Sequence, residues 1–568
     1  MSLTANLVAF GWVWTLLGAL FIALMMYLAS EANMQRFLHL LQLESYQLDG
    51  YGRSVKRNAR MDVWPAWGCA LVYAALSLGG FVLQAVLQAA LYNLIVGALA
   101  LCLFVAICLE TGKRKKQQKQ KKEYVRTDRM KRLERCTKMV LAAVSLICVL
   151  LGWAVIALTL DGSVMVAALG CFIAAILSAL PVCMLPQWVA LAATLRQRPE
   201  QKINRRFVED AVRIIDSRDD LIRVGITGSY GKTSTKFVLG TILQEKYDVL
   251  VPPSSYNTPM GVTRVIREML NDKHEVFVCE MGARRCGEIK ELCDIAKPKY
   301  GILTSIGNQH LETFGSIENI QKTKYELMQS LPADGKAFFP ADGALCEELY
   351  RQHTGPKCLF GLTEDCDVRA VNLDVGPFGS EFDLQIRGTD SVHCTTQLLG
   401  KHNIMNVLGC AATAYELGLT LAQIAAGIQK AEPVEHRLQL INPNNGTLVI
   451  DDAFNSNPNG TKAAMEVLSM YTQFRKICVT PGMVELGEKE EEENQAFGER
   501  MAAVCQFVIL VGQTRAIPIK RGLLKAGFPE ENIFVGENLD QATEILGALI
   551  RPGDVVLFEN DLPDHYEH

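Results

Sequence analysis

A glycine-rich segment that ends in lysine, threonine and serine is the part of the sequence whose residues point most directly to chemistry. It consists of Gly228, Ser229, Tyr230, Gly231, Lys232, Thr233 and Ser234. Glycines let consecutive backbone N–H groups face a phosphate, and the first turn of a following helix adds a favourable dipole. In such a loop the lysine reaches the β- and γ-phosphates of a nucleotide, and the threonine hydroxyl ligates Mg²⁺. The segment therefore predicts a nucleotide phosphate site.

The spacing Gly-x-x-Gly-Lys-Thr is shorter than the standard phosphate-loop consensus, so the flanking elements matter. The apolar run 221–226 reads as a buried strand, and the residues from Thr235 onward read as a helix. The alternative is a glycine-rich turn with a surface lysine. A strand before the segment and a helix after it favour the phosphate loop.

Carboxylates follow two other apolar runs. Glu280 ends the run 276–279, where a strand of an α/β sheet presents its ligands, and an oxygen ligand at that place suits Mg²⁺. The alternative is a solvated carboxylate at the end of a strand. Asp451 and Asp452 follow the run 447–450. Adjacent residues on an extended chain point in opposite directions, so at most one of these two aspartates faces a site.

The chain around these residues changes character after Pro199. From there on, short β-like apolar runs alternate with amphipathic helical stretches, which predicts an α/β fold with a parallel sheet. The chain has 568 residues, of which 49% are hydrophobic and 21% charged, and this excludes a disordered or collagen-like chain. The net charge of −4 gives no reason to expect a nucleic-acid partner. The 17 cysteines are scattered, so we interpret them as reduced thiols of a soluble part that faces the cytosol.

The apolar excess lies in the first 190 residues, in five runs of about 20 residues each, which is the length that crosses a bilayer. The runs are 7–28, 63–88, 91–109, 139–160 and 164–185. A cleaved signal peptide does not fit the first run, because no positive charge precedes it. The sequence thus predicts an α-helical membrane region of about five transmembrane helices over residues 1–198.

Basic residues between the runs predict the orientation. The loop between the first two runs and the stretch 113–135 are rich in lysine and arginine, whereas the connections near Gln88 and Asp161 contain neither. Basic loops stay inside, so the N-terminus is expected outside an inner membrane and the chain after Arg196 in the cytosol. The stretch 113–135 either binds anionic lipid headgroups or acts only as a topology signal.

A short apolar pattern in the first basic loop has two interpretations. Phe37, Leu38, Leu40, Leu41 and Leu43 follow one another along a helical stretch. This stretch either lies in the membrane interface as an amphipathic segment or packs on the cytosolic part.

The segment TGSYGKTST around Lys232 closely resembles the ATP loop of the Mur ligases, which form amide bonds in peptidoglycan assembly at the expense of ATP. Further segments resemble motifs of that family in the same order along residues 203 to 555. They are VCEMGA at 278–283, the stretch 305–327, GKHNIMN within 400–419, EHRLQL at 435–440 and IDDAFNSNP at 450–458. The resemblance is closest to the subfamily that adds D-alanyl-D-alanine to a UDP-linked muramoyl tripeptide.

The resemblance implies roles for individual residues. Metal ligation would fall to Thr233, Glu280, His310 and Lys324; Asn403, Arg437, Asp452 and Asn455 would contact ATP; and Lys232, His310 and Lys324 would be catalytic. In many members a lysine at the position of Lys324 is carbamylated. Lys322 and Lys324 stand two apart, so on a helix they point in different directions. ATP and Mg²⁺ are the implied cofactors.

The implied architecture is a phosphate-loop Mur ligase central domain at 199–432 and a Rossmann-like C-terminal domain at 433–568. The implied reaction is that of an ATP-dependent acid–amino-acid ligase, in which a carboxylate becomes an acyl phosphate that an amino acid or dipeptide amine attacks, leaving ADP and phosphate. The second domain would close over the nucleotide. Two other interpretations stay open: a ligase that resembles poly-γ-glutamate synthases, and a non-enzymatic partner built on the same fold.

The sequence departs from the family pattern in three places. The five apolar runs stand where relatives hold the UDP–sugar substrate, which suggests a lipid-linked precursor as the acceptor and membrane lipid as a partner. The last strand leads into Glu559-Asn560-Asp561 instead of Lys-Gly-Ser, near the place where relatives hold the amine. His436 stands where a glycine precedes the arginine.

Overall fold

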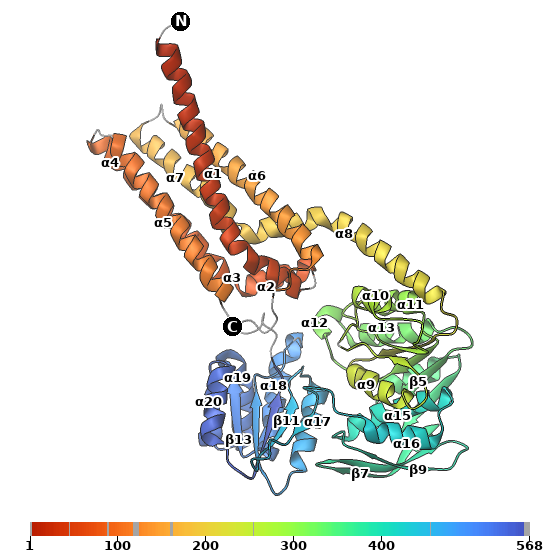
Figure 1. Cartoon of the computed structure of the whole chain (residues 1–568). Coiled ribbons are helices and arrows are strands. Elements are labelled where there is room, and N and C mark those ends of the chain that lie inside the picture. Colours follow the sequence, from red (N-terminus) through yellow and green to blue (C-terminus); the bar gives the residue numbers. More distant parts are fainter. Residues whose placement is uncertain are drawn as a thin grey trace. The chain divides into compact units, whose positions relative to one another are not determined.

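The computed structural model describes residues 3–44, 46–87, 90–117, 124–159, 163–253, 255–454, 456–484 and 486–561. They form two compact units, one that reaches to Ile203 and one that begins at Asn204 (Figure 1). The first unit is helical, and the second contains two β-sheets with their helices.

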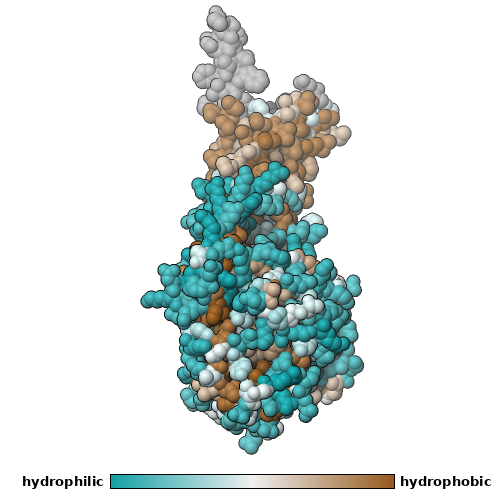
Figure 2. All heavy atoms as spheres, turned by 90° about the vertical axis from the view of Figure 1, so that its right-hand side faces the viewer, coloured by the Kyte–Doolittle hydropathy of each residue, from teal (hydrophilic) through white to brown (hydrophobic). Residues whose placement is uncertain are grey.

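The helical unit is built from long apolar helices. Its elements are α1 (Leu3–Leu43), α2 (Leu48–Arg57), α3 (Ala59–Asp62), α4 (Trp64–Leu87), α5 (Ala90–Gln117), α6 (Asp128–Thr159), α7 (Val164–Cys183) and the first part of α8 (Leu185–Asp216). Five segments are long and apolar enough to cross a membrane: Leu16–Leu43, Ala59–Leu83, Ile95–Lys115, Asp128–Thr159 and Val164–Cys183. This confirms the predicted helical region with five apolar helices. Hydrophobic side chains gather over the surface of these helices, in brown in Figure 2.

The end of α1 departs from both interpretations of the short apolar pattern. Phe37, Leu38, Leu40 and Leu41 are buried in one cluster with residues of α2, α6 and α8. Tyr51 of α2 closes this cluster and donates from its hydroxyl to the carbonyl of Pro186 at 3.1 Å. Helix α1 continues through these residues without a break. They therefore belong to the helical unit and form the core at one of its ends.

The first sheet of the α/β unit has the order β2-β3-β1-β4-β5-β6-β7-β8-β9. Strands β1 to β7 run parallel, and β8 and β9 continue the sheet as antiparallel strands. The strands are β1 (Ile222–Thr227), β2 (Val249–Leu250), β3 (Val276–Glu280), β4 (Tyr300–Leu303), β5 (Lys336–Pro340), β6 (Lys357–Gly361), β7 (Val368–Gly376), β8 (Gly379–Ile386) and β9 (Val392–Thr396). The helices are α9 (Lys232–Leu243), α10 (Pro259–Glu268), α11 (Glu288–Ala296), α12 (Leu311–Phe314), α13 (Ile317–Gln329), α14 (Ala344–Gln352), α15 (Lys401–Glu416) and α16 (Leu421–Lys430).

Both faces of the central strands are buried, and each packs into a hydrophobic cluster of its own. Val224 and Ile226 of β1 point into one cluster with α9 and α15, whereas Phe277 and Cys279 of β3 point into the other with α10, α11 and α13. The alternation of side chains along a strand explains this division. A parallel sheet with both faces covered presents its ligands at the carboxyl ends of the strands, which is where the phosphate loop follows β1.

The second sheet has the order β10-β11-β15-β12-β13-β14, and all neighbouring strands are parallel except β10 and β11. Its elements are β10 (Gln439–Ile441), β11 (Leu448–Asp452), α17 (Pro458–Ser469), β12 (Arg475–Thr480), a 3₁₀ turn (Gly487–Lys489), α18 (Glu490–Val504), β13 (Phe507–Val511), α19 (Gln513–Lys525), a 3₁₀ turn (Glu530–Asn532), β14 (Ile533–Gly536), α20 (Leu539–Leu549) and β15 (Asp554–Glu559). This is the Rossmann-like α/β arrangement that the sequence predicts.

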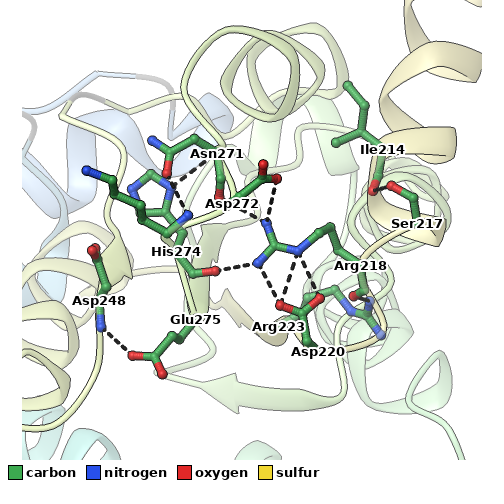
Figure 3. A network of polar contacts seen from close by, with 11 residues as sticks. Ile214, Ser217, Arg218, Asp220, Arg223, Asp248, Asn271, Asp272, His274 and Glu275 are labelled. Carbon is green, nitrogen blue, oxygen red and sulfur yellow. Dashed lines mark hydrogen bonds and ion pairs between the residues drawn. The ribbon is translucent and has the colours of Figure 1, made fainter.

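A polar network at the amino ends of the strands joins the end of α8 to the first sheet (Figure 3). The Arg218 guanidinium donates to the carbonyls of Asn271 and His274 at 2.9 and 2.7 Å and pairs with Asp220. Because the phosphate loop lies at the carboxyl ends, this network lies at the opposite edge of the sheet. Its contacts are structural: they connect the residues before β1 to the loop before β3.

The predicted domain boundaries fall in two kinds of structure. The boundary at 198/199 lies inside α8, which continues to Asp216 even though Pro199 is within it. The boundary at 432/433 lies in the connection after α16, between the two sheets. Helix α9 begins at Lys232, three residues before the predicted start at Thr235.

Candidate functional site

The phosphate loop has a conformation that depends on its two glycines. Gly228 has φ 151° and Gly231 has φ 80°. A Cβ atom on Gly228 would lie 2.0 Å from the Thr304 hydroxyl, and a Cβ on Gly231 would lie 2.5 Å from Oδ1 of Asn406. Positive φ and close neighbours together exclude larger residues at both positions. The loop therefore passes directly from β1 into the first turn of α9.

The residues after β4 hold this loop in place. The Ser229 backbone N–H donates to the carbonyl of Ser305 at 2.9 Å, and the Ser229 hydroxyl donates to the carbonyl of Gly307 at 3.0 Å. The Tyr230 N–H donates to the Ser305 hydroxyl at 2.9 Å. These bonds hold the loop through contacts within the protein itself, which is the condition for a preformed phosphate cradle.

Lys232 folds back over the loop. Its Nζ donates to the carbonyls of Gly228 at 2.7 Å and Ser229 at 3.0 Å. Burial lowers the pKa of Lys232 to about 8; the nearby Arg437 contributes to this shift, and Glu280 opposes it. The loop carbonyls offer Nζ only the partial negative charge of a dipole, whereas a phosphate group beside Nζ would offer a full negative charge. Lys232 is thus placed to stabilise phosphate oxygens.

Glu280 lies at the end of β3, next to the first turn of α9. Its Oε1 accepts hydrogen bonds from the Thr233 hydroxyl at 3.2 Å and from the amide of Asn257 at 2.9 Å. Its exposed fraction is 2%, so this carboxylate is buried. A hydroxyl and one carboxylate that meet beside a phosphate loop fit Mg²⁺, which keeps several waters and takes its other ligands from substrate phosphates.

Lys236 is a functional candidate that the motif comparison did not single out. It lies one helical turn after Lys232 in α9, its side chain is fully buried, and its Nζ lies 3.5 Å from Oε2 of Glu280. Burial lowers the pKa of Lys236, and the charge of Glu280 opposes this shift. The spacing of four residues from Lys232 was the available signal, because residues four apart share one face of a helix.

His310 and the metal site are less closely connected than predicted. Within the described part of the chain, no group of three or more histidine, cysteine, aspartate or glutamate side chains converges on a point where a metal ion fits. His310 precedes α12 in the left-handed region, with φ 55°. The structure thus brings Thr233 and Glu280 together but does not add His310 to them as part of such a group. The metal-binding role of His310 stays a prediction.

Lys324 and Lys322 occupy opposite sides of α13. Lys324 is 3% exposed, whereas Lys322 is exposed to solvent. The Lys324 Nζ lies 5.8 Å from the centre of the Phe314 ring. Burial moves the pKa of Lys324 well below its ordinary value, and the charge of Lys232 adds to the shift. Burial and a neighbouring positive charge both favour the neutral amine of a lysine, which is the form that reacts as a nucleophile.

Asn403 lies in the first turn of α15, behind the phosphate loop. Its amide donates to the carbonyl of Leu399 at 2.9 Å and its Oδ1 accepts from the amide of Asn406 at 3.3 Å. Asn406 is the residue whose side chain reaches Gly231. Both asparagines are buried. The motif comparison singled out Asn403 but not Asn406, although a spacing of three residues places both on one face of the helix.

Arg437 enters the site from the segment before β10. Its guanidinium lies 4.3 Å from the centre of the Phe454 ring, and its Nε is buried without a hydrogen-bond partner among the described residues. Burial lowers the pKa of Arg437, against the charges of Glu280 and Asp452. An arginine that is largely removed from water, with an unused donor, is suited to an anionic ligand. Asn455, which was predicted to contact ATP, lies outside the described residues.

His436 has a backbone conformation that glycine adopts without strain, which is consistent with the glycine that the family motif has at this place. Its φ is 61°, in the left-handed region. Its Nδ1 lies 2.7 Å from Oδ2 of Asp451. This contact compensates for part of the backbone strain that a glycine would avoid. It also places Asp451 away from Asp452, whose Oδ1 accepts from the N–H of Leu438 at 3.1 Å.

Asp452 and Glu559 form a buried carboxyl pair. They face each other at the carboxyl ends of the neighbouring strands β11 and β15. Glu559 is fully buried; its Oε1 accepts from the Ser456 hydroxyl at 2.7 Å, and its Oε2 has no donor among the described residues. Burial and the neighbouring carboxylate raise the pKa of Glu559 well above its ordinary value, and burial raises that of Asp452 to about 6. We infer that Glu559 keeps a proton and shares it with Asp452.

Replacement of Glu559 by glutamine is expected to stabilise the folded protein most at high pH. The pair keeps a proton in the folded state that the unfolded chain releases above about pH 4, so this pair reduces stability as the pH rises towards the folded-state pKa values. Glutamine removes one titrating group and still donates to Asp452. The melting temperature of Glu559→Gln should exceed that of the wild type at pH 8.5, and the difference should shrink as the pH falls.

Calorimetry of the full chain at several pH values measures this difference, with the exposed Glu531→Gln as the control. An equal offset at all pH values, or none at pH 8.5, would contradict the shared proton.

Comparison with known proteins adds to this geometry. The model of the Mur ligase middle domain matches residues 226–414, and the model of the Mur ligase glutamate ligase domain matches residues 436–559. The UDP-N-acetylmuramoyl-tripeptide–D-alanyl-D-alanine ligase of Mycobacterium tuberculosis is 31% identical over 363 residues, which cover 59% of this chain and 69% of the relative. Both matched domain models fall within the α/β unit.

Solved structures resemble the chain over a similar extent. Crystal structure I of MurF from Acinetobacter baumannii has a TM-score of 0.58 at 25% identity and covers 64% of this chain and 78% of its own. The MurF ligase from Thermotoga maritima in complex with ADP has a TM-score of 0.57 at 24% identity. The match covers 64% of this chain and 81% of that structure, which has the same fold.

Proposed function

The chain belongs to the Mur ligase family and is an ATP-dependent acid–amino-acid ligase, and from this premise we propose that it is a membrane-anchored enzyme that joins an amine such as D-alanyl-D-alanine to the carboxylate of a peptidoglycan precursor. The family and the relatives named above support a MurF-like peptidoglycan precursor ligase. The amine, the form of the acceptor and the membrane anchor are the parts that we add.

The observation that carries this function is the meeting of cationic and anionic side chains at the phosphate loop. Lys232 covers the loop, and Thr233 and Glu280 share a hydrogen bond beside it. Arg437, whose Nε has no hydrogen-bond partner among the described residues, enters from the segment before β10. These groups match what phosphoryl transfer needs: a cradle for the phosphates, an oxygen site for Mg²⁺ and a cation near the transferred group.

The proposed reaction has two steps. An oxygen of the acceptor carboxylate attacks the γ-phosphorus of ATP, the bond to the β–γ bridging oxygen breaks, and ADP leaves. The amine then attacks the carbonyl carbon of the acyl phosphate, and phosphate leaves as the amide forms and the nitrogen loses a proton. Lys232 and the loop N–H groups hold the phosphates in line, and Arg437 stabilises the charge that develops on the transferred group.

Mg²⁺ fits the Thr233–Glu280 side of the loop, where it would neutralise phosphate charge. Lys236 lies behind Glu280, so it balances this carboxylate from the side away from Thr233. Asn403, Asp452 and Asn455 are proposed nucleotide contacts, and His310 is a proposed metal ligand.

Lys324 is the proposed site of carbamylation. The neutral amine of a buried lysine attacks CO₂ and loses a proton, which gives an anionic oxygen ligand in place of a cation. The depressed pKa and the buried position of Lys324 favour this step.

Replacement of Lys324 by alanine should lower kcat by about 10²-fold, because one anionic ligand of the phosphoryl site is lost. Replacement of the exposed Lys322 by alanine on the same helix should leave kcat unchanged. The wild type, but not Lys324→Ala, should lose activity when CO₂ and bicarbonate are removed. If the wild type is indifferent to bicarbonate and mass spectrometry finds no carbamate, the carbamate assignment is wrong.

The five apolar helices carry the membrane part of the proposal. Their length and composition suffice to span a bilayer, and the basic loops support our proposal that the α/β unit lies in the cytosol beneath an inner membrane. The match to the Mur ligase middle domain begins after these helices, at residue 226. We therefore propose a lipid-linked precursor as the acceptor.

An amine-dependent assay of ADP release, run in detergent with soluble and lipid-linked tripeptide acceptors in parallel, tests the proposal. We expect D-alanyl-D-alanine to stimulate ADP release, with a lower KM for the lipid-linked acceptor. Equal use of both acceptors would contradict only the proposal that the acceptor is lipid-linked, and the ligase function would stand. A polymeric product from a single amino acid would contradict the D-alanyl-D-alanine function and indicate a poly-γ-glutamate type of ligase.

A further inference from the structure

An apolar groove runs along the surface of the helical unit between α4 and α5. Its volume is about 270 Å³. Pro65, Gly68, Val72 and Leu76 are among its residues on α4, and Ala100, Leu103, Phe104 and Ile107 line it on α5. Every one of these residues lies within a candidate membrane span.

The length of the groove matches one leaflet of a bilayer. The stretch from Pro65 to Leu76 rises by roughly 16 Å along α4, and the hydrocarbon core of a bilayer is roughly 30 Å thick. Helix α4 begins with Trp64, which is 66% exposed, as expected for an aromatic residue at the membrane interface. The groove thus occupies the half of the span next to the start of α4 and the end of α5.

That same end of the two helices is basic. Arg60 precedes α4, and Lys113 and Arg114 lie in the last turns of α5; all three are exposed. An ion-pair network lies beside them: Asp62 pairs with Arg36 at 3.1 Å and with Lys115 at 3.2 Å. Basic residues at one end of an apolar groove are complementary to a lipid with an anionic headgroup.

We propose that the groove binds the prenyl chain of a prenyl-phosphate-linked acceptor, with the phosphate at the basic end near Arg60, Lys113 and Arg114. This inference rests on the proposed function and names the binding site of its lipid-linked substrate. The bound lipid would hold the acceptor at the cytosolic surface, on the side of the membrane where the ligase unit is proposed to lie.

The shape of the groove favours a single branched chain over a phospholipid. Two helices alone form its walls, so it admits one chain, whereas a phospholipid carries two. Small residues such as Gly68 and Ala100 leave recesses in the walls beside the branched Val72 and Leu103. A methyl-branched chain makes more dispersion contacts with such a surface than a straight acyl chain does.

Two glycines of α4 provide a matched pair of variants. A Cβ atom on Gly68 or on Gly79 would meet nothing within 4 Å, so a side chain can leave the helix backbone at both positions. Gly68 lines the groove and Gly79 does not, although both lie on α4 and are exposed. Gly68→Leu therefore fills the groove, and Gly79→Leu adds the same side chain elsewhere on the same helix.

The test uses the full chain in phospholipid nanodiscs with a diazirine-bearing polyprenyl phosphate as the probe. We expect photolabelling of α4 and α5 between residues 65 and 107. Gly68→Leu should reduce labelling by about tenfold, equivalent to a weakening of one decade in affinity, and Gly79→Leu should not. Unlabelled polyprenyl phosphate should compete, and phosphatidylglycerol should not.

Equal labelling of Gly68→Leu and Gly79→Leu, or equal competition by phosphatidylglycerol, overturns the proposal. The activity assay separates this failure from failure of the proposed function. If labelling follows the prediction while neither acceptor is extended, the groove stands and the function fails. If the lipid-linked acceptor is extended and labelling ignores Gly68→Leu, only the groove is wrong.

Discussion

Replacement of Lys232 by alanine is expected to lower kcat for ADP formation by about 10³-fold. Lys232 is the side chain whose ammonium group covers the phosphate loop, and no loop N–H group can supply its full positive charge. The loop itself should persist, because its bonds to Ser305 and Gly307 do not involve the lysine side chain. Steady-state ADP release with saturating acceptor and amine measures the loss.

Two further variants serve as a control and as a test of the lysine's shape. Lys273→Ala removes an exposed lysine at the amino edge of the sheet, and it should match the wild type. Lys232→Arg keeps the charge but changes its shape, so it should recover nucleotide binding better than turnover. Substantial ADP formation by Lys232→Ala, in protein whose α/β unit is folded, would contradict the assignment of the phosphate loop.

Replacement of Lys236 by methionine is expected to lower the stability of the α/β unit by about 3–5 kcal/mol, because it leaves a buried carboxylate without its partner. The pair is removed from water: the side chains of Lys236 and Glu280 are 0% and 3% exposed. Glu280→Gln should also lower the stability of the α/β unit, because it leaves the buried ammonium group of Lys236 without its partner carboxylate. The double variant should lose much less stability than the two single variants lose together, since methionine and glutamine leave no unpaired charge.

Hydrogen exchange of the β1 and β3 amides in the full chain measures these changes locally. The exposed pair Arg264–Glu268, at 2.7 Å, serves as the control, and Arg264→Met should cost less than about 1 kcal/mol. Additive losses in the double variant would show that Lys236 and Glu280 do not act as a pair.

Several features could be predicted from the sequence because their physical causes act along the chain. Bilayer thickness sets the length of an apolar helix, so five such helices could be recognised from composition alone. The turn from β1 into α9 requires glycines and a lysine at fixed spacing, so the phosphate loop could be located to the residue. The order of the later motifs predicted both domains of the α/β unit.

The remaining features depend on contacts through space. Lys324 and Lys322 cannot be told apart by spacing, and only the packing of α13 buries one and exposes the other. The apolar end of α1 was assigned to the interface or to the cytosolic part, yet it packs into the helical unit, because hydrophobicity predicts burial without naming the partner.

The sequence by itself determined the apolar helices and the phosphate loop, because membrane thickness and local backbone sterics leave a pattern among neighbouring residues. Only the tertiary structure decided which charges meet. Lys236 reaches Glu280 because β1 and β3 are neighbours, and Asp452 faces Glu559 because β15 inserts beside β11. Strand order and register bring these residues together, and no spacing along the chain records them.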